Sequence, residues 1–463
     1  MKTLKRTGAG LLTAALAAGL LAGCGSSSTD TTTAASSGSS SASTTTAAAT
    51  TGSSSSSSSS SSEMTFAWWG NQVRNEETQN AIDEYESETG ISIDGQFSQW
   101  SDYWQKLATA SAGNELPDVI QMDYSYLNQY VSSGLLADLT SYTTDGTMDT
   151  TNWNESMINA GTVDGKLYAV CSGINAPCLI YDKSITDAAG VTIKDNMTLD
   201  EFVEICKTIY EKTGYKTNIE YGEASGVFSY WLRADGKVFF TDEGVNATEE
   251  ELAAYYDIYV DGMTNGWMVS PEIFAELSIG TTEQDPLVYG SSPDARSWCA
   301  FKTSNMYVGY LNVAQDGQEL LLTTQPSKDP QKSNYLKPSM FYAVSRDAED
   351  PQAAAAFIAW LTNSEEANNL LMGERGIPLN SEIADMVKEL LSEDEQAIYT
   401  YVEDVVVDNS SDINPPDPTG NSEAVSVFNQ ILEQLCYGMI SSEDAASQMI
   451  SEGTSVLQSK ASS

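Results

Sequence analysis

The sequence predicts an α/β protein built from two lobes. The chain has 463 residues, which is too long for one ordinary hydrophobic core and suits two. From Met64 onward, short apolar runs typical of strands alternate with amphipathic runs typical of helices, and this alternation indicates the α/β class.

The predicted elements can be placed in order along the chain. Strands are predicted over residues 64–69, 91–97, 118–122 and 306–308, and helices over residues 75–89, 103–111, 126–131, 353–361, 422–434 and 442–457. Two capping boxes, Thr198 with Glu201 and Thr248 with Glu251, begin further helices. The proline-rich stretch 411–421 is predicted as a loop.

Residues 1–23 are predicted to be a signal peptide. Lys2, Lys5 and Arg6 precede a short apolar run that ends in Leu-Ala-Gly, and Cys24 follows directly. This arrangement resembles the bacterial lipobox, in which the cysteine thiol receives a diacylglyceryl group; the alternative is an ordinary secretory peptide with an incidental cysteine. We therefore expect Cys24 to be lipidated, with the protein anchored to the extracytoplasmic face of the bacterial membrane.

Residues 24–62 consist almost entirely of Ser, Thr, Ala and Gly after the cysteine. Such a segment buries too little apolar surface to offset its ordering entropy, so we expect a disordered tether. At the dimensions of a flexible chain it would hold the folded part roughly 35 Å from the membrane.

Composition excludes several classes of function. The formal charge is −43 and becomes about −46 without the three cations of the leader, which excludes nucleic acid and an anionic membrane surface as direct partners. The chain contains no histidine, which removes Ser-His-Asp and Cys-His catalysis and the usual zinc hydrolases. The cysteines show no CxxC spacing, although one disulfide remains possible. We predict no metal, no cofactor and no catalytic residue.

Six segments of the chain resemble sequence motifs of one known family, and they occur in the same order as in that family. They are residues 114–123 (a Gly-x-x-Pro-Asp-Val type strand), 134–139, 164–183, 188–202, 301–309 and 342–380 (ending in Gly-x-Pro). Together they resemble the family 1 extracellular solute-binding proteins, the maltose-binding-protein-like class. Asp182, Leu199 and the stretch 303–305 depart from the family pattern.

The resemblance implies a type II periplasmic-binding-protein fold, with two α/β lobes joined by a hinge that the chain crosses more than once. The amino-terminal lobe would comprise residues 63–170 plus 340–378, and the carboxy-terminal lobe residues 171–339 plus 379–463. The crossings are expected near residues 170–173 and 341–345, with a ligand cleft between the lobes.

All but two of the candidate ligand-binding residues follow from the rule that ligands bind outside the carboxyl ends of strands in open α/β sheets; Trp231 and Trp298, which have no strand assignment, are added as stacking platforms of the second lobe. The candidates are Trp68, Trp69, Asn71, Gln99, Trp100, Asp123, Tyr124, Ser172, Asn175, Trp231, Trp298, Tyr310 and Asn312. Aromatic rings pack on the CH face of a pyranose, and Asp, Asn and Gln pair with its hydroxyl groups, so this set favours a sugar. Asp123 is the preferred polar ligand, because a carboxylate accepts two hydroxyls in charge-assisted bonds.

Each candidate also has a structural alternative. Either Trp68 or Trp69 must face the core, because adjacent strand residues point in opposite directions. Trp100 shields a helix start or meets ligand, and Asp123 caps the helix near 126 or binds ligand. Trp231 and Trp298 are stacking platforms or core residues. Arg375 reaches an acidic ligand group or pairs with a nearby Glu.

The predicted function is that of a non-enzymatic, monomeric substrate-binding lipoprotein of an ABC importer. It would bind a sugar or oligosaccharide reversibly by hinge closure and deliver it to the permease subunits, and it would touch the membrane only through its lipid anchor. The chain has no phosphate-binding loop of its own, so the ATPase is a separate chain. The alternatives are a secreted glycan-acting hydrolase, which needs two carboxylates at the cleaved bond, or a solute-binding protein for a peptide or polyamine.

Overall fold

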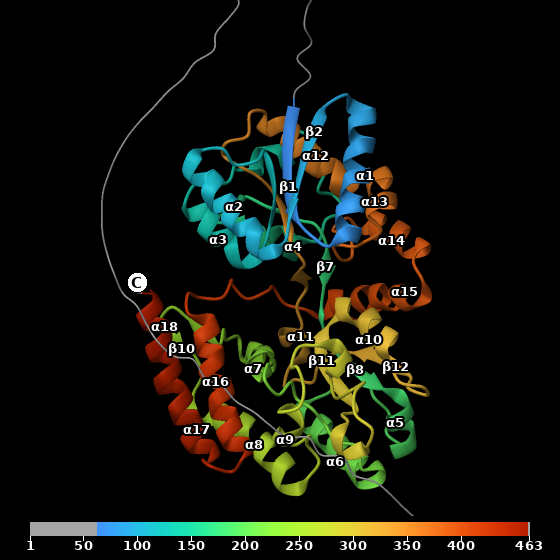
Figure 1. Cartoon of the computed structure of the whole chain (residues 1–463), viewed down its shortest axis with the longest axis vertical. Helices are drawn as coiled ribbons and strands as arrows, with labels where there is room; N and C mark the ends of the chain where they lie inside the picture. The colour runs from blue at the N-terminus through green and yellow to red at the C-terminus, as the bar shows by residue number, and fades with distance from the viewer. Residues whose placement is uncertain (1–62, 462–463) are drawn as a thin grey trace, which may run out of the picture. The chain divides into compact units, whose positions relative to one another are not determined.

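The computed structural model describes residues 63–461, in which two lobes are joined by short crossing segments (Figure 1). The predicted signal peptide, the lipidated Cys24 and the tether lie outside the described residues. The two lobes contain separate β-sheets, and a single short strand pair lies between them.

The amino-terminal lobe is built on a five-stranded sheet with the order β2-β1-β3-β14-β6. Its strands are β1 (Glu63–Trp69), β2 (Ser92–Ser98), β3 (Val119–Met122), β14 (Phe341–Val344) and β6 (Val170–Cys171), and a small hairpin is formed by β4 (Thr162–Val163) and β5 (Lys166–Leu167). β1 pairs in parallel with β2 and β3, whereas β14 is antiparallel to β3. All residues of β3 and β14 are buried, so the centre of the sheet is covered on both faces.

Helices cover both faces of this sheet. They are α1 (Gln72–Thr89), α2 (Trp100–Gly113), α3 (Tyr124–Ser132), α4 (Glu155–Ala160), α12 (Pro351–Asn363), α13 (Glu365–Leu371) and α14 (Ser381–Leu390). The first three begin immediately after β1, β2 and β3, so their amino-terminal ends meet at one edge of the sheet. Asn71 and Asp123 cap α1 and α3 by accepting hydrogen bonds from backbone N–H groups.

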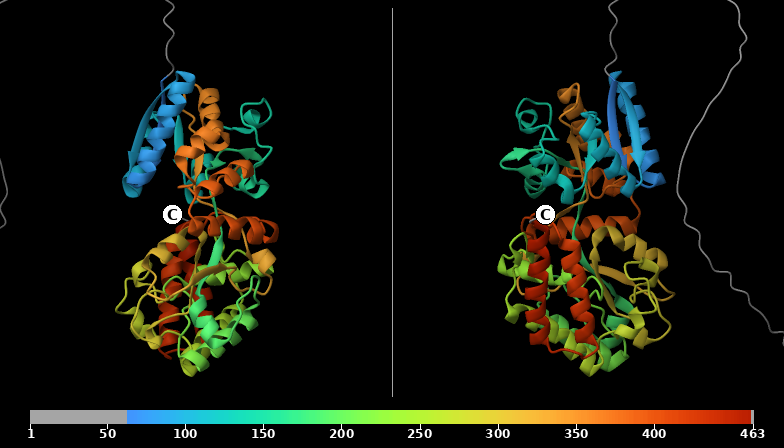
Figure 2. Two further views of the ribbon diagram at one scale, coloured as in Figure 1. Left: turned by 90° about the vertical axis from the view of Figure 1, so that its right-hand side faces the viewer. Right: turned by 60° about the vertical axis from the view of Figure 1, so that its left-hand side comes forward.

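The carboxy-terminal lobe contains an antiparallel sheet with the order β11-β8-β12. Its strands are β8 (Pro177–Asp182), β11 (Cys299–Thr303) and β12 (Leu320–Thr323), with a hairpin of β9 (Phe240–Thr241) and β10 (Gly244–Val245). Its helices are α5 (Lys183–Ala189), α6 (Leu199–Thr213), α7 (Ala224–Leu232), α8 (Glu249–Asn265), α9 (Pro271–Phe274), α10 (Tyr307–Val313), α11 (Pro330–Ser333), α16 (Asn421–Cys436), α17 (Ser442–Gln448) and α18 (Thr454–Ala461). Figure 2 shows α16 and the helices that follow it side by side on one flank of this lobe.

The hinge consists of β7 (Ile174–Asn175), β13 (Lys337–Pro338) and a bridge between Ile174 and Ile377. The backbone N–H of Ile174 donates to the Ile377 carbonyl at 2.7 Å, and the reverse bond is 3.1 Å long. Gly173 permits this close approach, because a Cβ atom at that position would lie 2.0 Å from the carbonyl oxygen of Arg375. Three stretches of chain are therefore hydrogen-bonded together at the crossing.

Most predicted elements are present, and both predicted capping boxes are confirmed, at α6 and α8. The expected strand 306–308 is wrong, since this stretch opens α10, whose tyrosines face the core. Residues 341–344 are not a crossing but the strand β14, and the return crossing is β13.

The chain after residue 379 does not belong entirely to the carboxy-terminal lobe, although the expected lobe boundary lies at that residue. Ile383 and Val387 on α14 pack in the hydrophobic cluster that contains β1 and β3, and α14 contacts α13 of the amino-terminal lobe. The helix α15 (Glu393–Thr400) lies between α14 and α10 and contacts both. Only α14 therefore departs from the expected boundary, since Tyr401, just after α15, donates to the Pro177 carbonyl of β8, and α16 packs in the core of the carboxy-terminal lobe.

We predict that Gly173→Ala weakens the hinge. The added methyl group collides with the Arg375 carbonyl, and its neighbours are backbone atoms that cannot rotate away, so unfolding free energy should fall by about 2 kcal/mol or more. Gly309→Ala is the matched control, because an added Cβ there meets no atom within 4 Å and a helical position favours Ala by about 0.5–1 kcal/mol. Denaturant titration of both variants tests this; equal stability of the two would contradict it.

Candidate functional site

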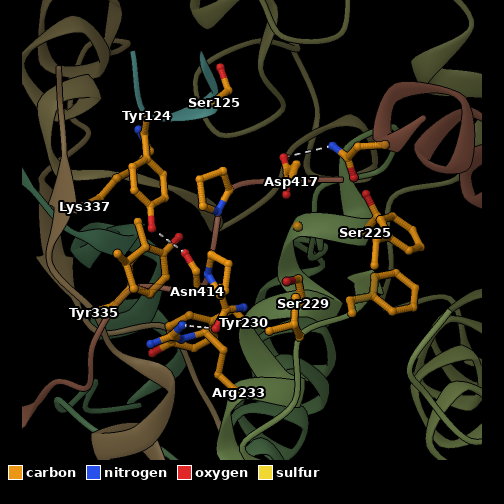
Figure 3. Close-up of a pocket in the computed structure, with 18 of the residues that line it drawn as sticks. Tyr124, Ser125, Ser225, Ser229, Tyr230, Arg233, Tyr335, Lys337, Asn414 and Asp417 are labelled. Carbon is orange, nitrogen blue, oxygen red and sulfur yellow. Dashed lines mark hydrogen bonds between the residues drawn. The ribbon is translucent and has the colours of Figure 1, made fainter. Parts of the chain in front are cut away.

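A cleft of about 380 Å³ lies between the lobes and receives side chains from both. Tyr124 and Ser125 reach it from the start of α3, and Ser225 and Ser229 from α7 (Figure 3). Its volume falls within the range of small-molecule sites in proteins. The cleft is therefore the leading candidate for a binding site.

The start of α3 connects the amino-terminal lobe, across the cleft, to the segment that contains Asn414. Asp123 caps the helix by accepting the Ser125 N–H at 2.9 Å. The Tyr124 hydroxyl donates to the Asn414 carbonyl at 3.0 Å, and burial raises the pKa of Tyr124 to about 12. Tyr124 thus remains a neutral donor at physiological pH and touches the segment that leads into α16.

One face of α7 lines the cleft from the opposite lobe. Ser225, Ser229 and Arg233 follow one another at helical spacing on this face. Phe228 and Trp231 lie on the other face, within the hydrophobic core of the lobe. The helix therefore presents the hydroxyl groups of Ser225 and Ser229, together with the side chain of Tyr230, to the cleft and keeps Phe228 and Trp231 away from it.

Arg233 holds the proline-rich segment 411–420 against the lobe. Its Nη2 donates to the Ser411 hydroxyl at 2.7 Å and to the Asp412 carbonyl at 2.8 Å, and its Nη1 donates to Asn414 Oδ1 at 2.5 Å. Its Nε donates to the Ser333 carbonyl at 2.9 Å, and its guanidinium lies 4.5 Å from the ring centre of Tyr335. Because every nitrogen is engaged, Arg233 positions the cleft wall rather than offering donors to a ligand.

Two charged side chains in the cleft have polar atoms that are not fully engaged by other residues and could bind a ligand. Within residues 63–461, the ammonium group of Lys337 on the hinge strand β13 makes no hydrogen bond or ion pair. Asp417 accepts one hydrogen bond, from the Asn421 amide at 2.9 Å, and burial raises its pKa. An ammonium and a carboxylate therefore flank the hydroxyl groups of α7 and the ring of Tyr124.

An aromatic platform, made of Trp69, Trp100, Trp104 and Tyr126, continues from the start of α3 across the amino-terminal lobe. Trp104 stacks on Tyr126 with ring centres 3.8 Å apart, and Trp69 meets Trp100 edge to face at 4.9 Å. Trp100 is 45% exposed, whereas Trp69 beneath it is 9% exposed. The platform thus offers an exposed indole next to the residues of α3 that line the cleft.

A second groove of about 560 Å³ shares Val425 with the cleft and follows α16 along the carboxy-terminal lobe. Tyr221 in this groove stacks on Phe274 with ring centres 4.6 Å apart. Asn429 donates to the Gly222 carbonyl at 2.7 Å, and its Oδ1 is buried without a partner among the described atoms. The two adjoining cavities provide more room than a single small ring requires.

Four of the predicted ligand residues are brought to this region. Asp123 and Tyr124 line the cleft, while Trp69 and Trp100 form the aromatic platform. Asp123 also caps α3, so both of its expected roles are available at once, through different oxygens: Oδ1 serves the cap. For these residues ligand contact remains a prediction.

Four other predicted residues are in the core instead. Trp68, Trp231, Trp298 and Tyr310 are at most 4% exposed. Trp68 alternates with Trp69 along β1 and points into the sheet packing, where its indole N–H donates to Asn75. Trp298 donates to Thr217, and Tyr310 donates to Asp285. These aromatic residues fill core volume, which corrects the expectation that they face the cleft.

The remaining candidates lie outside the cleft lining. Asn71 and Gln99 occupy the positions that precede α1 and α2, and both are exposed. Asn175 is buried in the hinge strand β7, where it pairs with Lys337, and Ser172 donates to the Met340 carbonyl. Asn312 is exposed on α10.

Sequence reasoning missed the residues that the carboxy-terminal lobe supplies: Ser225, Ser229, Arg233, Asn414 and Asp417. They come from a short apolar helix and from an irregular segment, not from the ends of parallel strands. The proline cluster after residue 414 was the available signal, since a loop between two helices is a common place for binding residues.

A buried polar network lies beneath the aromatic platform and includes Glu77 on α1. Burial, helped by the nearby carboxylate of Glu374, raises the Glu77 pKa to about 7 against the opposing effect of Arg375 and Arg74. Arg74 pairs with Glu374 at 2.6 Å. Glu77 Oε2 is buried without a hydrogen-bond partner in the described part of the chain.

Other kinds of site are not formed by the described residues. No group of three or more Cys, Asp or Glu side chains is placed to hold a metal ion between residues 63 and 461. The five cysteines in this range are free, and four are buried. No helix in this range is long and apolar enough to cross a membrane.

The fold and the cleft define a class: two α/β lobes, a hinge crossed by several segments and a cavity lined from both sides are features of solute-binding proteins. The family model described as bacterial extracellular solute-binding protein matches residues 80–397. The chain therefore belongs to this family of binding proteins.

Similar proteins agree with this assignment. A solved family 1 extracellular solute-binding protein from Alicyclobacillus acidocaldarius superposes with a TM-score of 0.76 at 25% identity, covering 86% of this chain and 98% of that one. The diacetylchitobiose binding protein of Streptomyces coelicolor is 32% identical over 130 residues, or 28% of this chain and 30% of that protein. An arabinooligosaccharide-binding protein of Halalkalibacterium halodurans is 23% identical over 299 residues, covering 60% and 64%. The sequence matches thus span about a third to two thirds of the diacetylchitobiose and arabinooligosaccharide binding proteins.

We predict that Glu77→Gln stabilises the protein at neutral pH but not at pH 4. A folded-state pKa near 7 lies above the usual 4.5, so the contribution of Glu77 to stability is largest at low pH and is lost as the pH rises between these values. The full shift corresponds to about 3 kcal/mol, and we expect about 1 kcal/mol because the side chain keeps some solvent contact.

Thermal unfolding at several pH values measures this difference. Glu76→Gln is the control, because Glu76 is an exposed neighbour on the same helix. A stability gain for Glu77→Gln that is independent of pH, or one matched by Glu76→Gln, would contradict the prediction.

Proposed function

We propose that the protein captures an oligosaccharide in the cleft between its lobes and delivers it to the permease subunits of an ABC importer. The observation that carries this proposal is the combination of an exposed indole, Trp100, with carboxylate and hydroxyl groups contributed by both lobes. Sugars need both an aromatic face and polar partners for their hydroxyl groups. Ligand that touches both lobes favours the closed state through its extra contacts there.

An oligosaccharide suits the site better than a monosaccharide. The groove beside α16 adjoins the cleft at Val425 and adds about 560 Å³ to its 380 Å³. Its stacked Tyr221 and the unpaired Asn429 oxygen provide an aromatic surface and an acceptor for further rings. The relatives named above bind diacetylchitobiose and arabino-oligosaccharides, which supports the same class of ligand here.

The remaining parts of the proposal concern location and chemistry. We infer that Cys24 carries a lipid and that the protein acts as a monomer on the outer face of the membrane, as the leader sequence predicts. The proposal involves no covalent step, since reversible capture requires only binding groups. The family is one of extracellular binding proteins, which supports both points.

We predict that Trp100→Ala weakens saccharide binding about tenfold, or about 1.4 kcal/mol, with little change in stability, because the exposed indole contributes more to ligand contact than to the core. Isothermal titration calorimetry of residues 63–463 against chito-oligosaccharides and arabino-oligosaccharides, from disaccharide to hexasaccharide, measures the effect. The wild type should bind longer chains more tightly.

Trp360→Phe is the matched control, because Trp360 packs on Tyr85 near the carboxyl end of α1, remote from the edge where α1 begins. If the protein bound polyamines or peptides instead of saccharides, the fold assignment would stand, but the proposed sugar ligand would be wrong. Release of shortened products from a bound chain would instead identify a hydrolase.

A further inference from the structure

Arg375 links the hinge to the interior of the amino-terminal lobe. Its carbonyl oxygen accepts a hydrogen bond from the Ser339 hydroxyl and lies against Gly173, so its backbone is part of the hinge. Its side chain is 4% exposed and runs into the lobe toward β3. One residue therefore touches both the crossing segments and the sheet.

The guanidinium of Arg375 is buried without an acidic partner. Its Nε donates to Gln121 Oε1 at 3.0 Å, and its Nη2 donates to the Thr78 hydroxyl at 2.7 Å. It lies 5.8 Å from the ring centre of Tyr342, and no carboxylate within residues 63–461 is in ion-pair distance. Burying a charge is costly unless it is well bonded, so a neutral residue would fill this space at lower cost. The position calls for an explanation beyond packing.

Arg375 fixes the orientation of the Gln121 amide. Because arginine has only donors, the oxygen of Gln121 must face it, and the amide nitrogen must face the other way. That nitrogen donates to the carbonyl of Trp69 at 3.1 Å, and the side chain of Gln121 is completely buried. Arg74 Nη1 donates to the same carbonyl at 3.2 Å.

Trp69 is the last residue of β1 and the base of the aromatic platform. Its ring lies 4.9 Å from that of Trp100, 5.3 Å from Tyr103 and 5.7 Å from Trp104. The hydrogen bonds to the Trp69 carbonyl from Gln121 and Arg74 restrain the backbone from which this indole extends.

We propose that Arg375 is a positioning residue, which orients the aromatic platform relative to the hinge through Gln121 and the Trp69 carbonyl. It does not touch the ligand. This inference rests on the proposed function in one respect: it takes the aromatic platform as the surface on which a saccharide ring packs.

Gln121→Glu separates positioning from stability. The carboxylate supplies Arg375 with an ionic partner, but it has no donor for the Trp69 carbonyl. We expect a melting temperature close to that of the wild type, an altered near-ultraviolet circular dichroism of the tryptophans and saccharide affinity reduced about tenfold.

Two arginine variants complete the experiment. Arg375→Met removes the donors and should change the spectrum and the affinity in the same way, while Arg375→Lys should be intermediate, because a single amine cannot replace the guanidinium fork. Arg296→Gln is the control: Arg296 is also buried and lies near the Tyr215 ring, but in the other lobe, so its loss should leave the affinity unchanged.

The outcomes distinguish this inference from the proposed function. An unchanged tryptophan spectrum in Gln121→Glu overturns the inference, and this measurement needs no ligand. A changed spectrum with wild-type affinity for the tested chito- and arabino-oligosaccharides also overturns it. Failure of the wild type itself to bind any saccharide rejects the proposed function, while the spectrum still decides whether Arg375 positions the platform.

Discussion

The close approach of three chain segments at the hinge is the constraint on which the rest of the structure depends. Gly173 lies against the carbonyl of Arg375, and Ile174 exchanges two hydrogen bonds with Ile377. These contacts bring together parts of the chain that are about 200 residues apart in sequence. They fix where one lobe ends and the other begins, and hence where a cleft can form between them.

The lobes contribute to this cleft in different ways. The amino-terminal lobe offers helix starts at one sheet edge, which place Tyr124 and the aromatic platform beside one another. The carboxy-terminal lobe offers one polar helix face and an irregular segment that Arg233 holds in place. An aromatic surface thus adjoins a cleft that hydroxyl groups line, which is an arrangement suited to a neutral polyol.

Sequence reasoning located the first three strands, their helices and both capping boxes, because these depend on local patterns of apolar residues and caps. It also located Asp123, Tyr124 and Trp100, since they follow strand ends directly. Trp298 and Tyr310 were misplaced because a tryptophan or tyrosine in sequence looks the same whether it fills a core or faces solvent. Burial depends on tertiary packing, which local patterns do not record.

The same limit applies to the residues that were missed. Ser225 and Ser229 line the cleft only because α7 packs its apolar face into the core of the lobe. Arg233 and Asn414 are 181 residues apart and meet only in the folded chain. Likewise, the family resemblance indicated two lobes but not that α14, which follows the expected boundary at residue 379, packs on the amino-terminal lobe.

The central claim, that a saccharide bridges both lobes and closes the hinge, is tested most directly by the distance between them. Spin labels at the exposed positions Asn128 on α3 and Asp257 on α8, in a Cys436→Ser background, report this distance by pulsed electron resonance. Adding the saccharide that binds most tightly should shorten and narrow the distance distribution. An unchanged distribution at saturating saccharide would contradict the account, because the ligand would then be held without joining the lobes.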